Sequence, residues 1–214
     1  MGRRDRYLGS IGWNEGAGRY VDLASGRFIS RQEAFEAVDR SIIALTEEAG
    51  DFLSGALTEG LPLEIFQRAL MREVKLGYMM TYVTGRGGWE QMTARDWGLV
   101  GQQIKEKYAY IEGFMGRISS GEVSEEQVRQ NMDMYFHNMV VGYWRGDREA
   151  QISSGKRYMI RHLNSRVPCK DCPGYAEHWE KIGDLPLPSE QCECRSACLC
   201  TVEYSETLLQ ERML

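Results

Sequence analysis

Cysteine is absent from the first 168 residues of this 214-residue chain, and proline is scarce, with five residues in all. No apolar run approaches the roughly eighteen residues that a membrane-spanning helix requires. The formal net charge is -5, so the chain also lacks the general surplus of positive charge that is typical of proteins that bind nucleic acid. These absences favour a globular protein without a membrane span. Eleven methionines and long periodic stretches indicate a helical body.

Residues 1–19 are rich in glycine and arginine and show no hydrophobic periodicity. We expect an N-terminal arm that is either disordered or ordered against a partner. Arg3, Arg4 and Arg6 give this arm a small basic patch that could make a weak contact with DNA phosphates. No apolar segment follows these arginines, so we predict no secretory signal and a reducing compartment.

Residues 20–155 are predicted to form a helical domain that begins with a short hairpin turning at Ser25-Gly26. Apolar residues then recur at spacings of three and four along four stretches, which predicts four long amphipathic helices. The first stripe contains Phe35, Val38, Ile42, Leu45, Ala49, Phe52 and Leu53. Four such helices can enclose one core, so a four-helix bundle or stacked helical hairpins is the predicted mainly α architecture.

Local signals predict where these helices begin. Ser30 with Glu33 and Ser124 with Gln127 have the spacing of capping boxes, Pro62 suits a first helical turn, and Thr93 starts the third helix. The fourth helix is expected to reach about Tyr143 and to end in an exposed charged stretch over residues 145–149. The glycine-rich residues 84–89 match neither a Walker A nor a dinucleotide-binding spacing, which favours a plain interhelical loop.

All six cysteines lie in the last part of the chain, which we predict to be a Cys-rich module over residues 156–214: Cys169, Cys172, Cys192, Cys194, Cys198 and Cys200. Cys169 and Cys172 have the spacing of a knuckle turn, and either Cys194 with Cys198 or Cys198 with Cys200 could supply a second pair. Two short Cys pairs joined by a loop are the usual ligands of a structural tetrahedral Zn2+ site. Residues 158–164 are expected to form a short strand or helix, and residues 199–204 a strand.

Two other states of these cysteines are possible in principle. Three disulfides would suit a secreted domain, which the absence of a secretory signal disfavours. A redox-active Cys-x-x-Cys pair normally opens a helix after a strand, whereas Pro173-Gly174 follows the first pair here and favours a turn. A single Zn2+ leaves two cysteines over, either as spare thiols or as alternative ligands.

The sequence shows no recognisable catalytic group. His137, His162 and His178 have no partner at a diagnostic spacing, although His178 could replace a cysteine as a ligand. Pro168-Cys169-Lys-Asp-Cys172 matches the second half of a zinc-deaminase signature, but the upstream half with its glutamate is missing. We therefore expect a structural zinc, no enzymatic activity and no small-molecule substrate.

Several stretches carry a resemblance to a known group of proteins: Tyr20-Val-Asp with Ser25-Gly-Arg-Phe28-Ile-Ser30, Arg86-Gly-Gly-Trp89-Glu-Gln-Met92 with Asp96-Trp97-Gly98, Tyr108 and Tyr110 before Phe114, and a tail running from Cys169 through Ile182-Gly-Asp-Leu-Pro186 to Cys200-Thr-Val-Glu-Tyr204. Together they make nearly the whole chain resemble tailed-bacteriophage virion proteins. The last forty or so residues also resemble, more distantly, the end of Mu F-like head-morphogenesis (minor capsid) proteins. That second resemblance implies Cys169, Cys172, Cys198 and Cys200 as ligands, with Cys194 in the place often held by His and Cys192 as an extra cysteine.

The resemblance implies a structural component of a phage particle, assembled in the host cytoplasm and located in the capsid or at the portal and neck. Its partners would be other virion proteins and further copies of itself, with Trp13, Trp89 and Trp144 as exposed anchors. A zinc-dependent nucleic-acid-binding or host-acting module is the alternative. Acidic residues outnumber basic ones around the cysteines, which disfavours a phosphate-binding face there.

Overall fold

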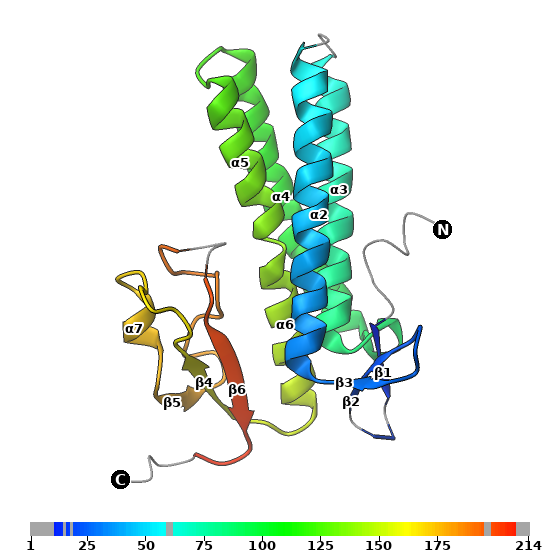
Figure 1. The fold of residues 1–214 in the computed structure, drawn as a ribbon, viewed down its shortest axis with the longest axis vertical. Helices are drawn as coiled ribbons and strands as arrows, with labels where there is room; N and C mark the ends of the chain where they lie inside the picture. The colour runs from blue at the N-terminus through cyan, green and yellow to red at the C-terminus, as the bar shows by residue number, and fades with distance from the viewer. Residues whose placement is uncertain (1–10, 15, 18, 59–61, 195–197, 209–214) are drawn as a thin grey trace.

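The computed structural model describes residues 11–208 apart from 15, 18, 59–61 and 195–197 (Figure 1). In chain order the elements are β1 (Ile11–Asn14), β2 (Arg19–Asp22), β3 (Phe28–Ile29), α2 (Arg31–Thr58), α3 (Leu63–Arg86), the 3-10 turn η1 (Trp89–Gln91), α4 (Ala94–Ser119), α5 (Glu125–His137), α6 (Val140–Ser153), β4 (Tyr158–His162), α7 (Cys172–Tyr175), β5 (Trp179–Lys181) and β6 (Thr201–Ser205). The mainly helical class is confirmed. None of the described helices combines the length and the apolar character that crossing a membrane demands.

The predicted helix starts are confirmed by side-chain contacts. At α2, the Ser30 backbone N–H donates to Glu33 Oε2 at 2.7 Å and the Glu33 backbone N–H donates to Ser30 Oγ at 3.1 Å. The same reciprocal capping box forms at Thr93 for α4 and at Ser124 for α5. Each box satisfies backbone amides that would otherwise lack a partner at the helix N-terminus, so the sequence alone defines these three starts.

The first predicted stripe faces the main core where the structure describes it. Val38 and Ile42 are buried, and Phe35 packs at the edge of the same cluster. The side chains of Leu45, Ala49, Phe52 and Leu53 lie outside the described set. From α3 to α6 the same core takes in Phe66, Leu70, Val74, Ile111, Phe114, Met132, Phe136 and Tyr143.

The prediction of a single fourth helix is wrong. α5 ends at His137, and after a tight turn through Asn138 and Met139 the chain continues as α6. The turn is held by the Thr81 hydroxyl of α3, which donates a hydrogen bond to the Met139 carbonyl oxygen at 2.8 Å. This partner lies 58 residues away in the chain, so no local pattern reveals the break.

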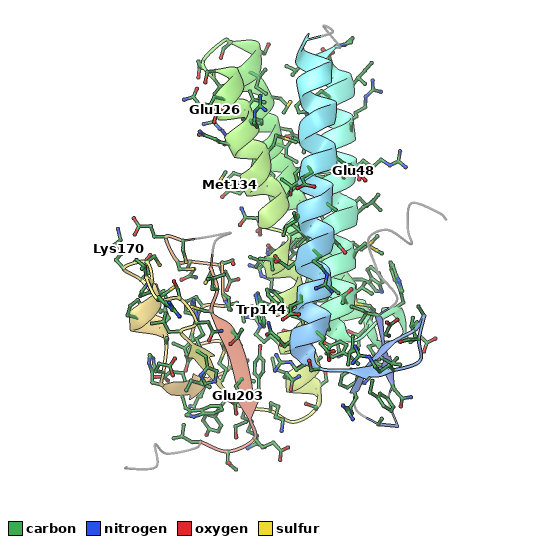
Figure 2. The ribbon with its side chains drawn as sticks, in the orientation of Figure 1. Glu48, Glu126, Met134, Trp144, Lys170 and Glu203 are labelled. Atoms are coloured by element: carbon green, nitrogen blue, oxygen red, sulfur yellow. The ribbon has the colours of Figure 1, made fainter. Side chains whose placement is uncertain are left out.

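The expectation of an exposed charged end after Tyr143 is also wrong. Residues 145–149 lie inside α6, where Asp147 is fully buried and Glu149 nearly so. Trp144, predicted to be an exposed anchor, is 3% exposed and packs against Phe35 with 4.8 Å between ring centroids. Figure 2 shows it on α6, where the helices face the C-terminal module. Residues 140–149 of α6 are therefore largely covered by the rest of the protein.

Close packing of α3 on α6 depends on glycine. A Cβ atom on Gly85 of α3 would overlap the backbone carbonyl oxygen of Tyr143, and one on Gly146 of α6 would overlap that of Tyr82. Gly142 has a similar relation to the Thr81 side chain. Because the obstacles at Gly85 and Gly146 are backbone atoms, the two helices approach closely only where a side chain is missing.

The N-terminal hairpin is confirmed and is part of a larger sheet. β2 pairs antiparallel with β3, and β1 pairs with the other edge of β2. Residues 11–14 therefore pair with residues 19–22 of their own chain, which differs from the expected arm. Tyr20 fixes this sheet to the helices, since its hydroxyl donates to the Gly85 carbonyl oxygen at 2.8 Å. Arg3, Arg4 and Arg6 lie outside the described residues.

The C-terminal module is built on a second antiparallel sheet, in the order β5-β4-β6. Residues 158–164, expected to be a short strand or helix, contain strand β4, the strand predicted over residues 199–204 is β6, and the two strands pair with each other. In the register of this pair Met159 lies opposite Tyr204 and Arg161 opposite Val202, and alternation along each strand places these four side chains on one face. Met159, Val202 and Tyr204 belong to the main hydrophobic core, so this face is turned toward the helices (Figure 1).

Candidate metal centre

The six cysteines come together from two segments of the C-terminal module. Cys169 lies just before α7 and Cys172 is its first residue, while the other four lie on the segment that leads into β6. They form a cluster of their own with Leu163 at its edge: Cys172, Cys192 and Cys200 are buried, and Cys169, Cys194 and Cys198 are partly buried. Residues 173–191, which include most of α7 and all of β5, thus bring together sulfur atoms that lie more than twenty residues apart in the chain.

Four of these sulfur atoms have the spacing of a metal-ligand set. The Sγ atoms of Cys172, Cys192, Cys194 and Cys198 all lie within 4.8 Å of one another. Individual separations are 3.3 Å for Cys192 and Cys194, 3.5 Å for Cys172 and Cys194, and 4.0 Å for Cys172 and Cys198. Ligands of a tetrahedral zinc with Zn–S bonds of about 2.3 Å lie about 3.8 Å apart, close to these values. The four cysteines could therefore hold one metal ion.

The four-cysteine set differs from the one that the resemblance implies. Cys192, regarded as an extra cysteine, belongs to the mutual set, whereas Cys169 and Cys200 lie just outside it. Both nevertheless pack in the same cluster as the other four cysteines. None of the six cysteines forms a disulfide. All six predicted site residues are thus gathered in one cluster.

The environment shifts the pKa values of these thiols in opposite directions. Burial raises the pKa of Cys169, but hydrogen bonds from the backbone N–H groups of Cys172 and Cys194 outweigh this effect, and the pKa falls to about 6. Burial, together with the neighbouring sulfur atoms, raises the pKa values of Cys172 and Cys194. Backbone donors thus stabilise a thiolate at Cys169, and the crowded central sulfurs need a cation before they can all ionise.

Arg161 of β4 supplies positive charge to this cluster, and the sequence analysis missed it. The side chain is fully buried, and its Nη2 donates to the Sγ atoms of Cys172 and Cys198 at 3.6 Å each. It also interacts with the sulfurs of Cys200 and Cys192. Among the described residues no carboxylate pairs with it. Burial lowers the pKa of Arg161, but the sulfur contacts outweigh burial and raise it, so the guanidinium stays charged.

Strand geometry explains why Arg161 reaches the cysteines. It lies two residues after Met159 on the helix-facing side of β4, and Nη1 donates to the Pro186 carbonyl oxygen at 3.1 Å. The guanidinium also lies over the Tyr175 ring, 5.4 Å from its centroid. A buried guanidinium without a carboxylate needs another anion, and among the described residues the acceptors beside it that can carry negative charge are cysteine sulfurs. This arrangement fits thiolates, and thus a bound cation, better than six neutral thiols.

The histidines do not join the cluster where the structure describes their side chains. His162 Nε2 lies 3.0 Å from Glu203 Oε2, and its Nδ1 lies 3.6 Å from Glu177. His178 Nδ1 lies 2.9 Å from the Ala176 carbonyl oxygen. The candidate ligand group found among the described residues contains four cysteines and no histidine. The side chain of His137 lies outside the described set.

The surface around the cysteines carries charges of both signs. Lys170 lies on the outer side of the module and pairs with Glu193 at 3.3 Å (Figure 2). Arg161 is buried, and His162 lies between two glutamates, so these groups are not available to a phosphate. Close to the cysteines, Lys170 is thus paired with a carboxylate, and Arg161 is enclosed by the module.

Comparison of the chain with protein-family models, curated proteins and solved structures found no match.

Proposed function

We propose that the cysteine cluster binds Zn2+ as a structural clamp, and that the chain is an interface-forming structural protein of a tailed-phage particle. The observation that carries the zinc proposal is Arg161, a buried cation whose neighbouring acceptors are cysteine sulfurs. Zinc is the metal that best suits a set of thiolate ligands in four-coordinate geometry. Four thiolates around Zn2+ carry a net charge of 4 × (-1) + 2 = -2, which the guanidinium partly neutralises.

An all-sulfur ligand set supports a structural role for the metal. A catalytic zinc usually keeps one position for water or substrate beside a general base, whereas four thiolates close the coordination sphere. The Arg161 guanidinium, which donates to two of these sulfurs, is not suited to take a proton at neutral pH. The clamp would instead fix the segment before β6 against α7, where few apolar side chains are available for a core.

The helical body offers surfaces suited to assembly. Trp89 and Trp97 stack with 5.6 Å between ring centroids and are 43% and 39% exposed, and Tyr110 of α4 is 68% exposed. Exposed aromatic side chains are frequent anchors of protein interfaces. We propose that the helices form one bundle, with α5 and α6 together in the fourth position, that presents these residues to neighbouring virion proteins or to further copies of the chain.

The zinc proposal is tested by metal content. The full chain, purified under reducing conditions without chelator, is passed over a size-exclusion column with light scattering, and zinc is quantified across the protein peak. We expect zinc bound at a constant ratio to protein, in a peak larger than a monomer. Protein without metal across the peak would contradict the clamp, and a strictly monomeric peak would contradict self-association.

The virion proposal needs a separate measurement. Particles released from cells that carry the gene are purified on a density gradient, and the chain is quantified by mass spectrometry against the major capsid protein. We expect a constant ratio across the particle peak that survives a high-salt wash. A ratio that falls at each purification step would contradict a place in the particle while leaving the zinc proposal intact.

A further inference from the structure

Two cysteines remain unexplained by a single metal ion. Cys169 and Cys200 lie outside the set of four sulfurs that are all within 4.8 Å of one another. They are not isolated, since all six cysteines pack in one cluster. In it Cys169 interacts with Cys172 and Cys194, and Cys200 interacts with Cys172 and Arg161.

Cys172 and Cys194 occupy the centre of the cluster. Cys172 interacts with Cys169, Cys194, Cys198 and Cys200, and Cys194 interacts with Cys169, Cys172, Cys192 and Cys198. Their own sulfurs lie 3.5 Å apart. Of the remaining four cysteines, Cys192 and Cys198 complete the mutual set with them, and Cys169 and Cys200 lie beyond it. Cys172 and Cys194 thus connect the mutual set with the two cysteines outside it.

From this pattern we propose that the cluster binds two Zn2+ ions that share the thiolates of Cys172 and Cys194. One ion is held by the shared pair with Cys192 and Cys198, and the other by the shared pair with Cys169 and Cys200. Six thiolates with two of them bridging give each ion four sulfur ligands, the number that structural zinc requires. The proposal rests on the zinc clamp proposed above and extends it, because all six cysteines now serve as zinc ligands.

The charge of a two-ion cluster fits its surroundings. Six thiolates and two Zn2+ ions carry 6 × (-1) + 2 × (+2) = -2, the same net charge as one zinc with four thiolates. Arg161 interacts with sulfurs assigned to both ions, namely Cys198 and Cys192 of one and Cys200 of the other, as well as with the bridging Cys172. One buried guanidinium thus lies against the whole cluster, and no carboxylate or imidazole ligand is required.

Metal stoichiometry tests the proposal directly. The full chain is reduced, stripped of metal, refolded with ZnCl2, desalted and measured by native mass spectrometry and elemental analysis. We expect two zinc ions per chain. One ion per chain would overturn the two-ion cluster and leave the structural clamp standing, whereas none would overturn both.

Cysteine variants separate the two ions. Cys169→Ser removes a ligand from the outer ion alone, so we expect one ion to remain, and Cys200→Ser is expected to do the same. Val167→Ser changes a neighbouring residue that is 87% exposed and is expected to keep two ions. Stoichiometry that is the same in Cys169→Ser, Cys200→Ser and the unmodified chain would overturn the assignment.

Sharing of thiolates has its own signature. In the full chain loaded with 113Cd2+, a bridging sulfur connects the two cadmium nuclei through two bonds, so we expect two 113Cd resonances that are split by coupling to each other. Two resonances without mutual coupling would overturn the bridge, and a single resonance would overturn the second ion.

Discussion

The helical body and the C-terminal module bury different kinds of side chain. Between α2 and α6 the core is a continuous apolar cluster to which every long helix contributes, including Ile42, Leu70, Phe114 and Phe136. The module shares that core through the helix-facing side of its sheet. Around α7 and the segment that leads into β6, however, the buried cluster consists of cysteines with Leu163 at its edge. In the proposed clamp, sulfur ligands around a metal ion would add folding free energy to a segment that buries little apolar surface around its cysteines.

The largest expected effect comes from removing a central sulfur. Cys172→Ser should abolish the proposed metal binding, which for structural zinc contributes roughly 10 kcal/mol. We expect amides of residues 158–205 to exchange with solvent deuterium much faster, while amides of α3 and α4 keep their protection. Hydrogen exchange read by mass spectrometry measures both regions in one sample. Equal protection of the module in this variant and in Val167→Ser would show that apolar packing alone orders it.

The next effect concerns the ion pair that joins the two regions. Asp147 of α6 is fully buried and pairs with Arg31 of α2, whose guanidinium also lies over the Tyr204 ring of β6. Asp147→Asn leaves this guanidinium without its carboxylate, and we expect a loss of about 3–5 kcal/mol in the free energy of unfolding.

Denaturant titration measures that loss, and Glu206→Gln is the matched control. Glu206 pairs with Lys156 at 3.0 Å on the surface, where such a pair contributes less than about 1 kcal/mol. Equal losses for the two variants would mean that burial does not distinguish the two ion pairs.

A third prediction tests the close approach of helices within the body. Gly146→Ala places a Cβ against the Tyr82 backbone of α3, and we expect destabilisation by about 1–3 kcal/mol in the same titration. Gly116→Ala on α4 meets nothing within 4 Å and should stabilise by about 0.5–1 kcal/mol, because alanine is the better helix former. The same sign of change in both variants would contradict the glycine-dependent contact.

The last prediction concerns the buried guanidinium that lies against the sulfur cluster. Arg161→Met keeps most of the side-chain volume but removes the donors to Cys172 and Cys198, and we expect metal affinity to fall by about 10- to 100-fold. Competition with a chromophoric chelator measures this change. Arg157→Met changes the exposed residue immediately before β4 and should leave the affinity unchanged. Unaltered affinity in Arg161→Met would mean that the guanidinium does not stabilise the thiolates.

Much of the fold could be predicted because its signals are local. Capping boxes at Ser30, Thr93 and Ser124 involve residues three positions apart, and the hairpin at Ser25-Gly26 lies within eleven residues. The break after His137 could not be predicted in this way, since it depends on Thr81. Nor could the burial of Asp147, whose charged neighbours in the chain are typical of an exposed surface and whose partner lies 116 residues away.

The same division holds for the candidate metal centre. The sequence by itself determined that six cysteines lie within 32 residues, in two groups that a loop can join. Only the tertiary structure decided that Cys192 belongs with Cys172, Cys194 and Cys198, and that Arg161 lies beside them. The type and spacing of the candidate ligands are properties of the chain. Which of the similar thiols come together, and which charge faces them, depends on how strands β4 and β6 pair and on where this pairing places the segments that carry the cysteines.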